Sequence, residues 1–302
     1  MAGLSQSDGR FAPSPTGPLH LGSLRTALVA WLFARGVGAR FLVRVEDLDR
    51  QRSRRAFEAG QLADLRALGL DWDGPVVRQS QRLERYEEAL ASLERAGRLY
   101  PCFCTRAEIR EASLAPHRPD AGGGYPGTCL ALSDAERARR IAAGDQYALR
   151  VRADRERVWF TDRMLGEQST IVDDFVVRRA DGVAAYQLAV VVDDAAQGIG
   201  EVVRGADLAD STPRQILLAR LLGLPVPRYA HVPLVLGADG ARLAKRHGAA
   251  TLADRGEPVA ATLALLAHSL GLARGRERVR AAPELLDEFN PAQLPRAPTV
   301  LA

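Results

Sequence analysis

Residues 10–45 constrain the fold more than any other part of the chain. Residues 10–12 are a short apolar stretch around one arginine, and residues 13–18 include three prolines and a glycine, which excludes regular secondary structure there. From Leu19, apolar residues recur at helical spacing until Gly36 and Gly38, and residues 39–45 form a second apolar stretch. We interpret this order as strand, loop, helix and strand, the right-handed crossover unit of a parallel sheet. The sequence therefore predicts an α/β fold built on a doubly wound parallel sheet.

Later segments predict further elements of the same kind. Amphipathic helices are expected over residues 51–70 and 80–97, and another helix over residues 210–222. The mostly apolar, valine-rich run at residues 184–192 predicts a central parallel strand, and residues 229–236 predict another buried strand. Ligands of such sheets bind beyond the carboxyl ends of the strands, so functional residues are expected there.

Residues 101–129 lack periodicity and are rich in glycine and proline, which indicates an inserted module. We expect four segments: a first half of the main domain at 1–100, an inserted module at 101–180, a second half of the main domain at 181–250, and a short helical tail at 251–302.

The composition, with 47% hydrophobic and 26% charged residues, is typical of a globular protein with a full core. No apolar run reaches the roughly 18 residues that a membrane helix needs, and the polar residues 1–9 do not resemble a secretory signal. We therefore expect a cytoplasmic protein without a membrane partner. As a separate expectation, the chain acts as a monomer. The net charge of +4 and the pI near 9.2 permit an anionic partner without requiring one.

The loop and helix start at residues 13–23 can form an anion site, because free backbone N–H groups and the helix dipole face a ligand there. His20 can donate to a phosphate, and Gly22 leaves room for a flat base. The stretch resembles the first signature of class I aminoacyl-tRNA synthetases in the glutamyl and glutaminyl branch, with Ser23 replacing the last histidine. The resemblance implies a Rossmann-like catalytic domain that uses ATP and Mg²⁺. It places ATP against Pro13, Ser14, His20, Gly22 and Ser23.

The single lysine of the chain is a second candidate, because forty of the 41 basic residues are arginine. One interpretation is that this lysine was retained by accident and has no function. The other is that its position needs a compact ammonium with three donors, which differs functionally from a planar guanidinium. Lys245 lies where the resemblance puts the second lysine of the mobile signature loop that closes on the triphosphate. Arg242 replaces the first lysine and Ala244 replaces the serine. The resemblance implies that His20 and Lys245 are catalytic and that Arg242 and Lys245 contact ATP.

The amino-acid pocket is the third candidate. Glutamate carries two carboxylates and one ammonium, so a specific site needs two cationic or polar clamps and one anion. The residues that match the glutamate-binding positions of glutamyl-tRNA synthetases are Arg10, Phe11, Ala12, Pro13, Ser14, Glu46, Tyr186 and Arg204. Val190 replaces an asparagine of many full-length enzymes, which would make the pocket less polar. His231, in a buried strand, is expected to be structural, and Arg52, Arg54 and Arg55 to be a solvated face.

Cys102, Cys104 and Cys129 are the only cysteines, and their clustering favours a metal site over a disulfide framework. Zinc prefers four tetrahedral ligands, and from chemistry alone His117 is the natural fourth. The segment that runs from Tyr125 to Cys129 instead resembles the zinc site of glutamyl-queuosine tRNA(Asp) synthetases, which implies Tyr125 as the fourth ligand. One structural Zn²⁺ per chain would fold a loop-rich insert.

The acceptor is inferred from the short C-terminal region. About fifty residues follow the last motif, whereas glutamyl-tRNA synthetases carry a long helical body that reads the anticodon. A catalytic core without that body resembles glutamyl-queuosine tRNA(Asp) synthetases, which attach glutamate to queuosine in the anticodon loop of tRNA(Asp). A truncated glutamyl-tRNA synthetase that charges a tRNA 3′ end, and a non-enzymatic paralogue that binds nucleotide or tRNA, are the alternatives.

Overall fold

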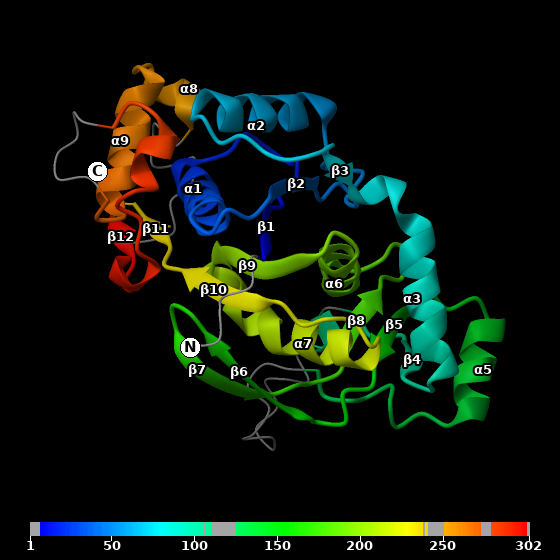
Figure 1. The fold of residues 1–302 in the computed structure, drawn as a ribbon. Coiled ribbons are helices and arrows are strands. Elements are labelled where there is room, and N and C mark those ends of the chain that lie inside the picture. Colours follow the sequence, from blue (N-terminus) through cyan, green and yellow to red (C-terminus); the bar gives the residue numbers. More distant parts are fainter. Residues whose placement is uncertain are drawn as a thin grey trace.

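The computed structural model describes residues 7–105, 107–109, 125–237, 239–240, 251–272 and 279–300. A seven-stranded sheet forms its centre, in the order β3-β2-β1-β9-β10-β6-β7 (Figure 1). All neighbouring pairs are parallel except β6 and β7, which form an antiparallel hairpin. The strands are β1 (Asp8–Phe11), β2 (Phe41–Val45), β3 (Val77–Arg78), β6 (Arg157–Asp162), β7 (Gly166–Ile171), β9 (Ile199–Gly205) and β10 (Arg228–Val232).

Helices cover both faces of this sheet. The helices of the described residues are α1 (Leu21–Arg35), α2 (Arg55–Ala67), α3 (Leu83–Arg95), α5 (Asp134–Ala142), α6 (Tyr186–Ala196), α7 (Thr212–Leu221), α8 (Leu252–Arg255) and α9 (Val259–Ser269). Neighbouring residues of one strand contribute to different core clusters: Val203 packs with α1 and α9, whereas Val202 packs with α3, α6 and α7. This alternation follows from the two-residue period of a strand, and Figure 1 shows α1 and α6 on opposite sides of β9. The predicted doubly wound α/β sheet is confirmed.

The first crossover forms as the sequence predicts. β1 and β2 are parallel neighbours joined through α1, with Arg10 paired to Leu42 in register. The buried apolar side chains of α1 lie between the sheet and α9, and Gly36 ends the helix.

One predicted strand is wrong. Residues 186–192 of the apolar run form the start of helix α6, and the strand beside β1 is β9 instead. Seven consecutive residues of α6, from Leu188 to Asp194, are buried, because the helix packs against α3, α7, β8 and β9. A helix buried on all sides shows no amphipathic period, and its tertiary contacts outweigh the strand preference of valine.

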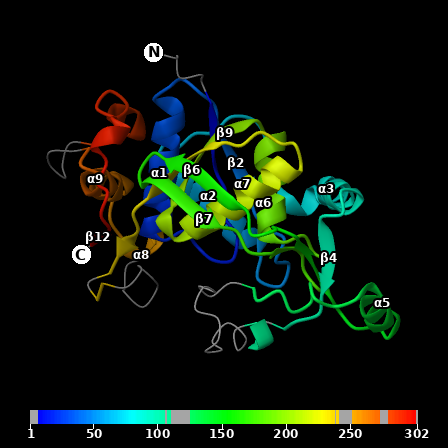
Figure 2. The same ribbon diagram turned by 90° about the horizontal axis from the view of Figure 1, so that it is seen from below.

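The remaining elements lie beside the main sheet. A small antiparallel sheet contains β4 (Leu99–Cys102), β5 (Ala148–Val151) and β8 (Phe175–Arg178), while β11 (Val235–Leu236) pairs with β12 (Thr299–Val300). Figure 2 shows β4 and α5 at one side of the molecule and α9 and β12 at the other. The 3₁₀ helices are η1 (Gln79–Gln81), η2 (Ala206–Ser211), η4 (Ala282–Leu285) and η5 (Pro291–Gln293). β6 and β7 join the large sheet although they fall within the predicted insert, and the four segment boundaries stay a prediction.

Among the described residues, no helix combines the length and apolar character that crossing a bilayer would require.

Candidate active site

A cavity of about 510 Å³ lies at the carboxyl ends of β1, β2 and β9. The residues predicted to bind glutamate all line it: Arg10, Phe11, Ala12, Pro13, Ser14, Glu46, Tyr186 and Arg204. The described residues predicted to bind ATP line it as well: Pro13, Ser14, His20, Gly22 and Ser23. The structure thus brings together residues from distant parts of the chain, while their contacts with ligands stay predictions.

The loop at residues 13–18 is held from several sides. The side-chain amide of Gln61 on α2 donates to the carbonyl of Ser14 at 3.0 Å and to that of Gly17 at 2.7 Å. The backbone N–H of Glu46 donates to the carbonyl of Pro13 at 2.9 Å. Gln61 is therefore a supporting residue that sequence reasoning missed, because a glutamine on an amphipathic helix carries no signal of its own.

His20 is the N-cap of α1. Its Nδ1 accepts a hydrogen bond from the backbone N–H of Ser23 at 3.2 Å, and its Nε2 lies 3.2 Å from the Ser23 hydroxyl. Because Nδ1 accepts, Nε2 carries the proton in this arrangement. A Cβ at position 22 would lie 3.2 Å from the His20 ring, so Gly22 permits this close packing. The ring lies on the cavity wall at a positive helix end, where a phosphate is stabilised.

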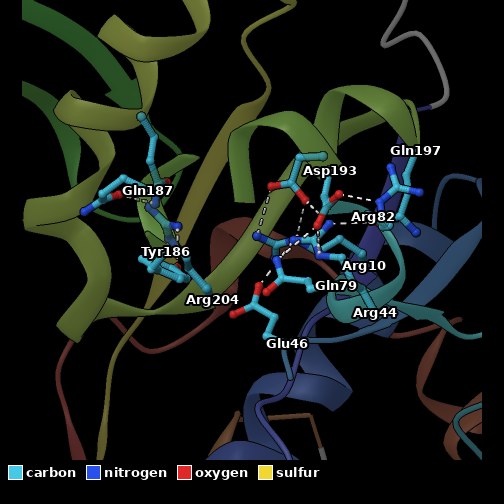
Figure 3. A network of polar contacts seen from close by, with 12 residues as sticks. Arg10, Arg44, Glu46, Gln79, Arg82, Tyr186, Gln187, Asp193, Gln197 and Arg204 are labelled. Atoms are coloured by element: carbon cyan, nitrogen blue, oxygen red, sulfur yellow. Dashed lines mark hydrogen bonds and ion pairs between the residues drawn. The ribbon is translucent and has the colours of Figure 1, made fainter. Parts of the chain in front are cut away.

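Arg10 and Arg44, which lie close together in Figure 3, share the carboxylate of Asp194. Asp194 accepts from Arg10 at 3.2 Å and 3.3 Å and from Arg44 at 2.6 Å. Burial works to raise the pKa of Asp194, but the charges and hydrogen bonds of both arginines outweigh it, so the pKa lies below its ordinary value. Arg10 is 4% exposed and Arg44 is fully buried. The cavity wall is therefore fixed by a paired and hydrogen-bonded charge cluster.

Glu46 supplies the anion of the cavity. Its carboxylate lies 3.4 Å from Arg44. Burial raises the pKa of Glu46, and the charge of Asp194 adds to this, whereas Arg44 and Arg10 lower it without offsetting the rise. A carboxylate destabilised in this way gains from a cationic ligand such as an ammonium group.

Asp193, the residue before Asp194 on α6, supports the site through a second set of contacts. It accepts hydrogen bonds from Gln79 at 3.0 Å and from the Tyr86 hydroxyl at 2.8 Å, and it forms an ion pair with Arg82. This second carboxylate fixes α6 against η1 and α3, so the helix that carries Tyr186 at its start is held in place.

Arg204 on β9 is the second guanidinium of the cavity. Its Nε donates to Nε2 of His231 at 3.0 Å, its NH2 donates to the Thr212 hydroxyl at 2.8 Å, and its NH1 lies 3.4 Å from the Tyr186 hydroxyl. Figure 3 places Arg204 and Tyr186 on one side of Glu46, and Arg10 and Arg44 on the other. The cavity can therefore offer two cationic groups and one anionic group to a single small ligand.

A second cavity, of about 710 Å³, adjoins the first and shares Ser14, Glu46 and Tyr186 with it. Its other walls include Cys102 and Cys104 and the charged side chains of Asp49, Arg52, Arg179 and Asp181. Space therefore continues from the first cavity toward the cysteine cluster.

The three cysteines form a compact cluster, because all their sulfur atoms lie within 4.8 Å of one another. Tetrahedral zinc with bonds of about 2.3 Å separates two sulfurs by about 3.8 Å, and the Cys104 and Cys129 sulfurs lie 3.3 Å apart. The Tyr125 hydroxyl is 3.5 Å from the Cys102 sulfur and 3.9 Å from the Cys104 sulfur. Burial raises the pKa of Cys104 to about 12, so a cation would be needed to hold its thiolate at neutral pH. This donor set fits a zinc ion.

Several predicted residues cannot be placed in this site. Arg242, Ala244, Lys245 and His117 lie outside the described residues. The described residues that flank the Lys245 segment lie close to the cavity: Val235 lines it, and Thr251 forms a β-bridge with His20. Val190 is buried in the core and is not part of the cavity wall.

Comparison with known proteins identifies the class. The family model of the catalytic domain of class I tRNA synthetases (E and Q) matches residues 8–294. The chain therefore belongs to the class I tRNA synthetases and is a ligase, and enzymes of this class use ATP and Mg²⁺.

Within this class, the chain is in the same family as proteins named "Glutamyl-Q tRNA(Asp) synthetase". The protein of that name from Nocardia farcinica is 60% identical over 296 residues, which cover 97% of this chain and 92% of the relative. The one from Symbiobacterium thermophilum is 52% identical, with 96% and 94% covered.

Solved structures show the same architecture. A glutamate tRNA ligase from Elizabethkingia meningosepticum, crystallised in complex with its amino acid, matches with a TM-score of 0.83 and 26% identity. The match covers 99% of this chain and 67% of that one. The relatives support a glutamyl-tRNA synthetase-like activity for this chain.

Proposed function

We propose that the protein activates L-glutamate with Mg-ATP and transfers the glutamyl group to queuosine in the anticodon loop of tRNA(Asp). The observation that carries the proposal is that Arg10, Glu46 and Arg204 line one cavity beside the loop and helix start at residues 13–23. Two guanidinium groups and one carboxylate complement the two carboxylates and the ammonium of glutamate. The names of the relatives supply the acceptor.

In the first step, an α-carboxylate oxygen of glutamate attacks the α-phosphorus of ATP. The bond to the bridging oxygen breaks, and glutamyl-adenylate and pyrophosphate form. His20 and Lys245 stabilise the charge that builds up on the phosphates, and positioning of the two substrates supplies most of the rate.

In the second step, a hydroxyl oxygen of the queuosine cyclopentene diol attacks the carbonyl carbon of the adenylate. An ester forms, AMP leaves, and the hydroxyl proton is lost. We expect a monomer to catalyse both steps, and because ATP and tRNA are the substrates, we place the reaction in the cytoplasm. Cys102, Cys104, Cys129 and Tyr125 would hold a structural zinc ion beside this site.

The test is incubation with radiolabelled glutamate, ATP and tRNA(Asp), with and without queuosine, followed by mapping of the label to a ribonuclease fragment. Label in the anticodon fragment that depends on queuosine supports the proposal. Label at the 3′ end would identify a truncated glutamyl-tRNA synthetase instead. Absence of glutamate-dependent exchange between pyrophosphate and ATP would indicate a protein that only binds its ligands.

A further inference from the structure

The side chains of His231 and Asp162 form a chain of hydrogen bonds that ends at Arg204. Arg204 on β9 and His231 on β10 are direct partners in the parallel register, and Asp162 ends β6, the strand on the other side of β10. The hydrogen bonds follow this strand order, from Arg204 through His231 to Asp162. Arg204 Nε lies 3.0 Å from His231 Nε2, and His231 Nδ1 lies 2.6 Å from the Asp162 carboxylate.

The chemistry of these contacts fixes the state of the imidazole. A guanidinium N–H can only donate, so His231 Nε2 must accept and Nδ1 must carry the proton that it donates to Asp162. The other oxygen of Asp162 accepts from the backbone N–H groups of Met164 at 2.8 Å and Leu165 at 3.0 Å, which fixes the carboxylate. Burial lowers the pKa of His231 and the charge of Arg204 adds to this, while the bond to Asp162 only partly opposes them. His231 is therefore neutral in the folded protein.

The two cationic groups of the cavity consequently differ in charge compensation. Arg10 is in direct contact with the carboxylate of Asp194, and Arg44 shares that contact. Over the described ranges of the chain, Arg204 forms no ion pair: its hydrogen-bond partners are a neutral imidazole, two hydroxyls and the Leu208 carbonyl, and its guanidinium lies 5.4 Å from the centre of the uncharged Tyr229 ring. The carboxylate of Asp162 is separated from Arg204 by the imidazole of His231. Since Arg204 is only 5% exposed, its charge is weakly screened by water and is kept for a ligand.

We infer that the Asp162–His231 pair is a positioning device, which fixes the rotation of Arg204 without neutralising it, so that Arg204 selects a substrate carboxylate over a neutral amide. The inference rests on the proposed function, because it takes glutamate as the ligand of Arg204. A carboxylate in place of His231 would hold the guanidinium as firmly but would cancel the charge that the substrate needs. The neutral imidazole supplies orientation alone.

Three variants separate this role from a merely structural one. Asp162→Asn keeps the shape, and its amide N–H donates to Nδ1, which moves the ring proton to Nε2 and removes the acceptor for Arg204. His231→Leu removes the acceptor at similar volume, whereas His231→Gln offers a carbonyl oxygen in its place. His268→Gln, on the exposed side of α9, is the matched control.

The experiment measures glutamate-dependent pyrophosphate exchange, with separate KM values for glutamate and ATP, and the preference for glutamate over glutamine. We expect Asp162→Asn and His231→Leu to raise the KM for glutamate about tenfold or more, as loss of a well-formed contact to a charged group does. Both should lower the preference for glutamate while the KM for ATP changes little, and His231→Gln should restore most of the affinity. If His231→Leu does not fold, Asp162→Asn and His231→Gln carry the same comparison.

An unchanged KM for glutamate in Asp162→Asn would overturn the inference, as would an equal rise of both KM values or a His231→Gln variant no better than Asp162→Asn. The wild-type protein separates this failure from that of the proposed function. If the wild type shows no glutamate-dependent exchange, the proposed function fails and the inference fails with it. If the wild type is active and the variants match it, only the inference fails.

Discussion

Asp194 binds Arg10 with both of its carboxylate oxygens, at 3.2 Å and 3.3 Å, although 184 residues separate the two in the sequence. The same carboxylate holds Arg44, whose side chain is fully buried. Two guanidinium groups therefore share one acid, although Arg44 also lies 3.4 Å from Glu46 and 3.7 Å from Asp193. The wall of the candidate active site and the stability of the fold thus depend on the same contact.

Asp194→Asn should lower the free energy of unfolding by about 3–5 kcal/mol, because it leaves the buried Arg10 without its carboxylate partner and removes the shortest of the ion pairs of Arg44. It should also weaken glutamate binding, because Arg10 loses its fixed orientation. Urea unfolding and glutamate titration measure the two effects. Asp154→Asn is the control, since the exposed pair of Asp154 with Arg98 should contribute only about 0–1 kcal/mol. A similar loss in both variants would contradict the special role of Asp194.

The stability of the protein should depend on pH through His231. Its folded pKa lies below the ordinary value, so between that pKa and about pH 6.5 the unfolded chain binds more protons than the folded one. The free energy of unfolding should therefore fall as the pH falls below about 6.5. His231→Gln lacks this component, so its unfolding free energy should decrease less between about pH 7 and pH 5.5. Equal slopes in the two proteins, from urea unfolding across this range, would show that His231 does not titrate as described.

The cysteine cluster should bind one zinc ion per chain, measurable by elemental analysis of the purified protein. Cys129→Ser should lose most of the metal and lower the melting temperature, since a structural zinc contributes folding free energy. Tyr125→Phe and His117→Ala distinguish the two candidates for the fourth ligand. We expect Tyr125→Phe to weaken zinc binding by at least about tenfold and His117→Ala to leave it unchanged. The reverse result would assign the fourth position to His117.

The sequence predicts the first crossover well because residues within the crossover itself mark where each element begins and ends. Prolines at 13, 15 and 18 exclude regular structure between β1 and α1, and Gly36 and Gly38 stop the helix. The periodicity between these breaks gives the element type directly. In α6 both faces are buried, so an apolar run could be a strand or a helix, and only the packing against α3 and α7 decides.

The residues of the cavity wall were predictable, but the residues that hold them were not. Arg10, Glu46 and Arg204 could be named because a dicarboxylic amino acid needs their charges and because their positions resemble a known family. The pairing of Asp194 with Arg10, and of His231 with Arg204, depends on which strands are neighbours. His231 was expected to be structural, and its burial agrees with this, but a sequence does not reveal which side chain lies beside it in the sheet.

Lys245 provides the last test, because the single lysine of the chain follows the strand that ends at the cavity. If its ammonium stabilises the phosphates only as the carboxylate attacks, Lys245→Ala should lower kcat for pyrophosphate exchange about 100-fold or more and leave glutamate binding unchanged. Lys245→Arg keeps the charge but replaces the compact ammonium with a planar guanidinium, so its activity should lie between that of the wild type and that of Lys245→Ala. Arg139→Ala, on the exposed face of α5, is the control for loss of one surface charge. Steady-state kinetics and glutamate titration of the three variants make the comparison, and a Lys245→Ala variant with normal kcat would remove the lysine from the mechanism.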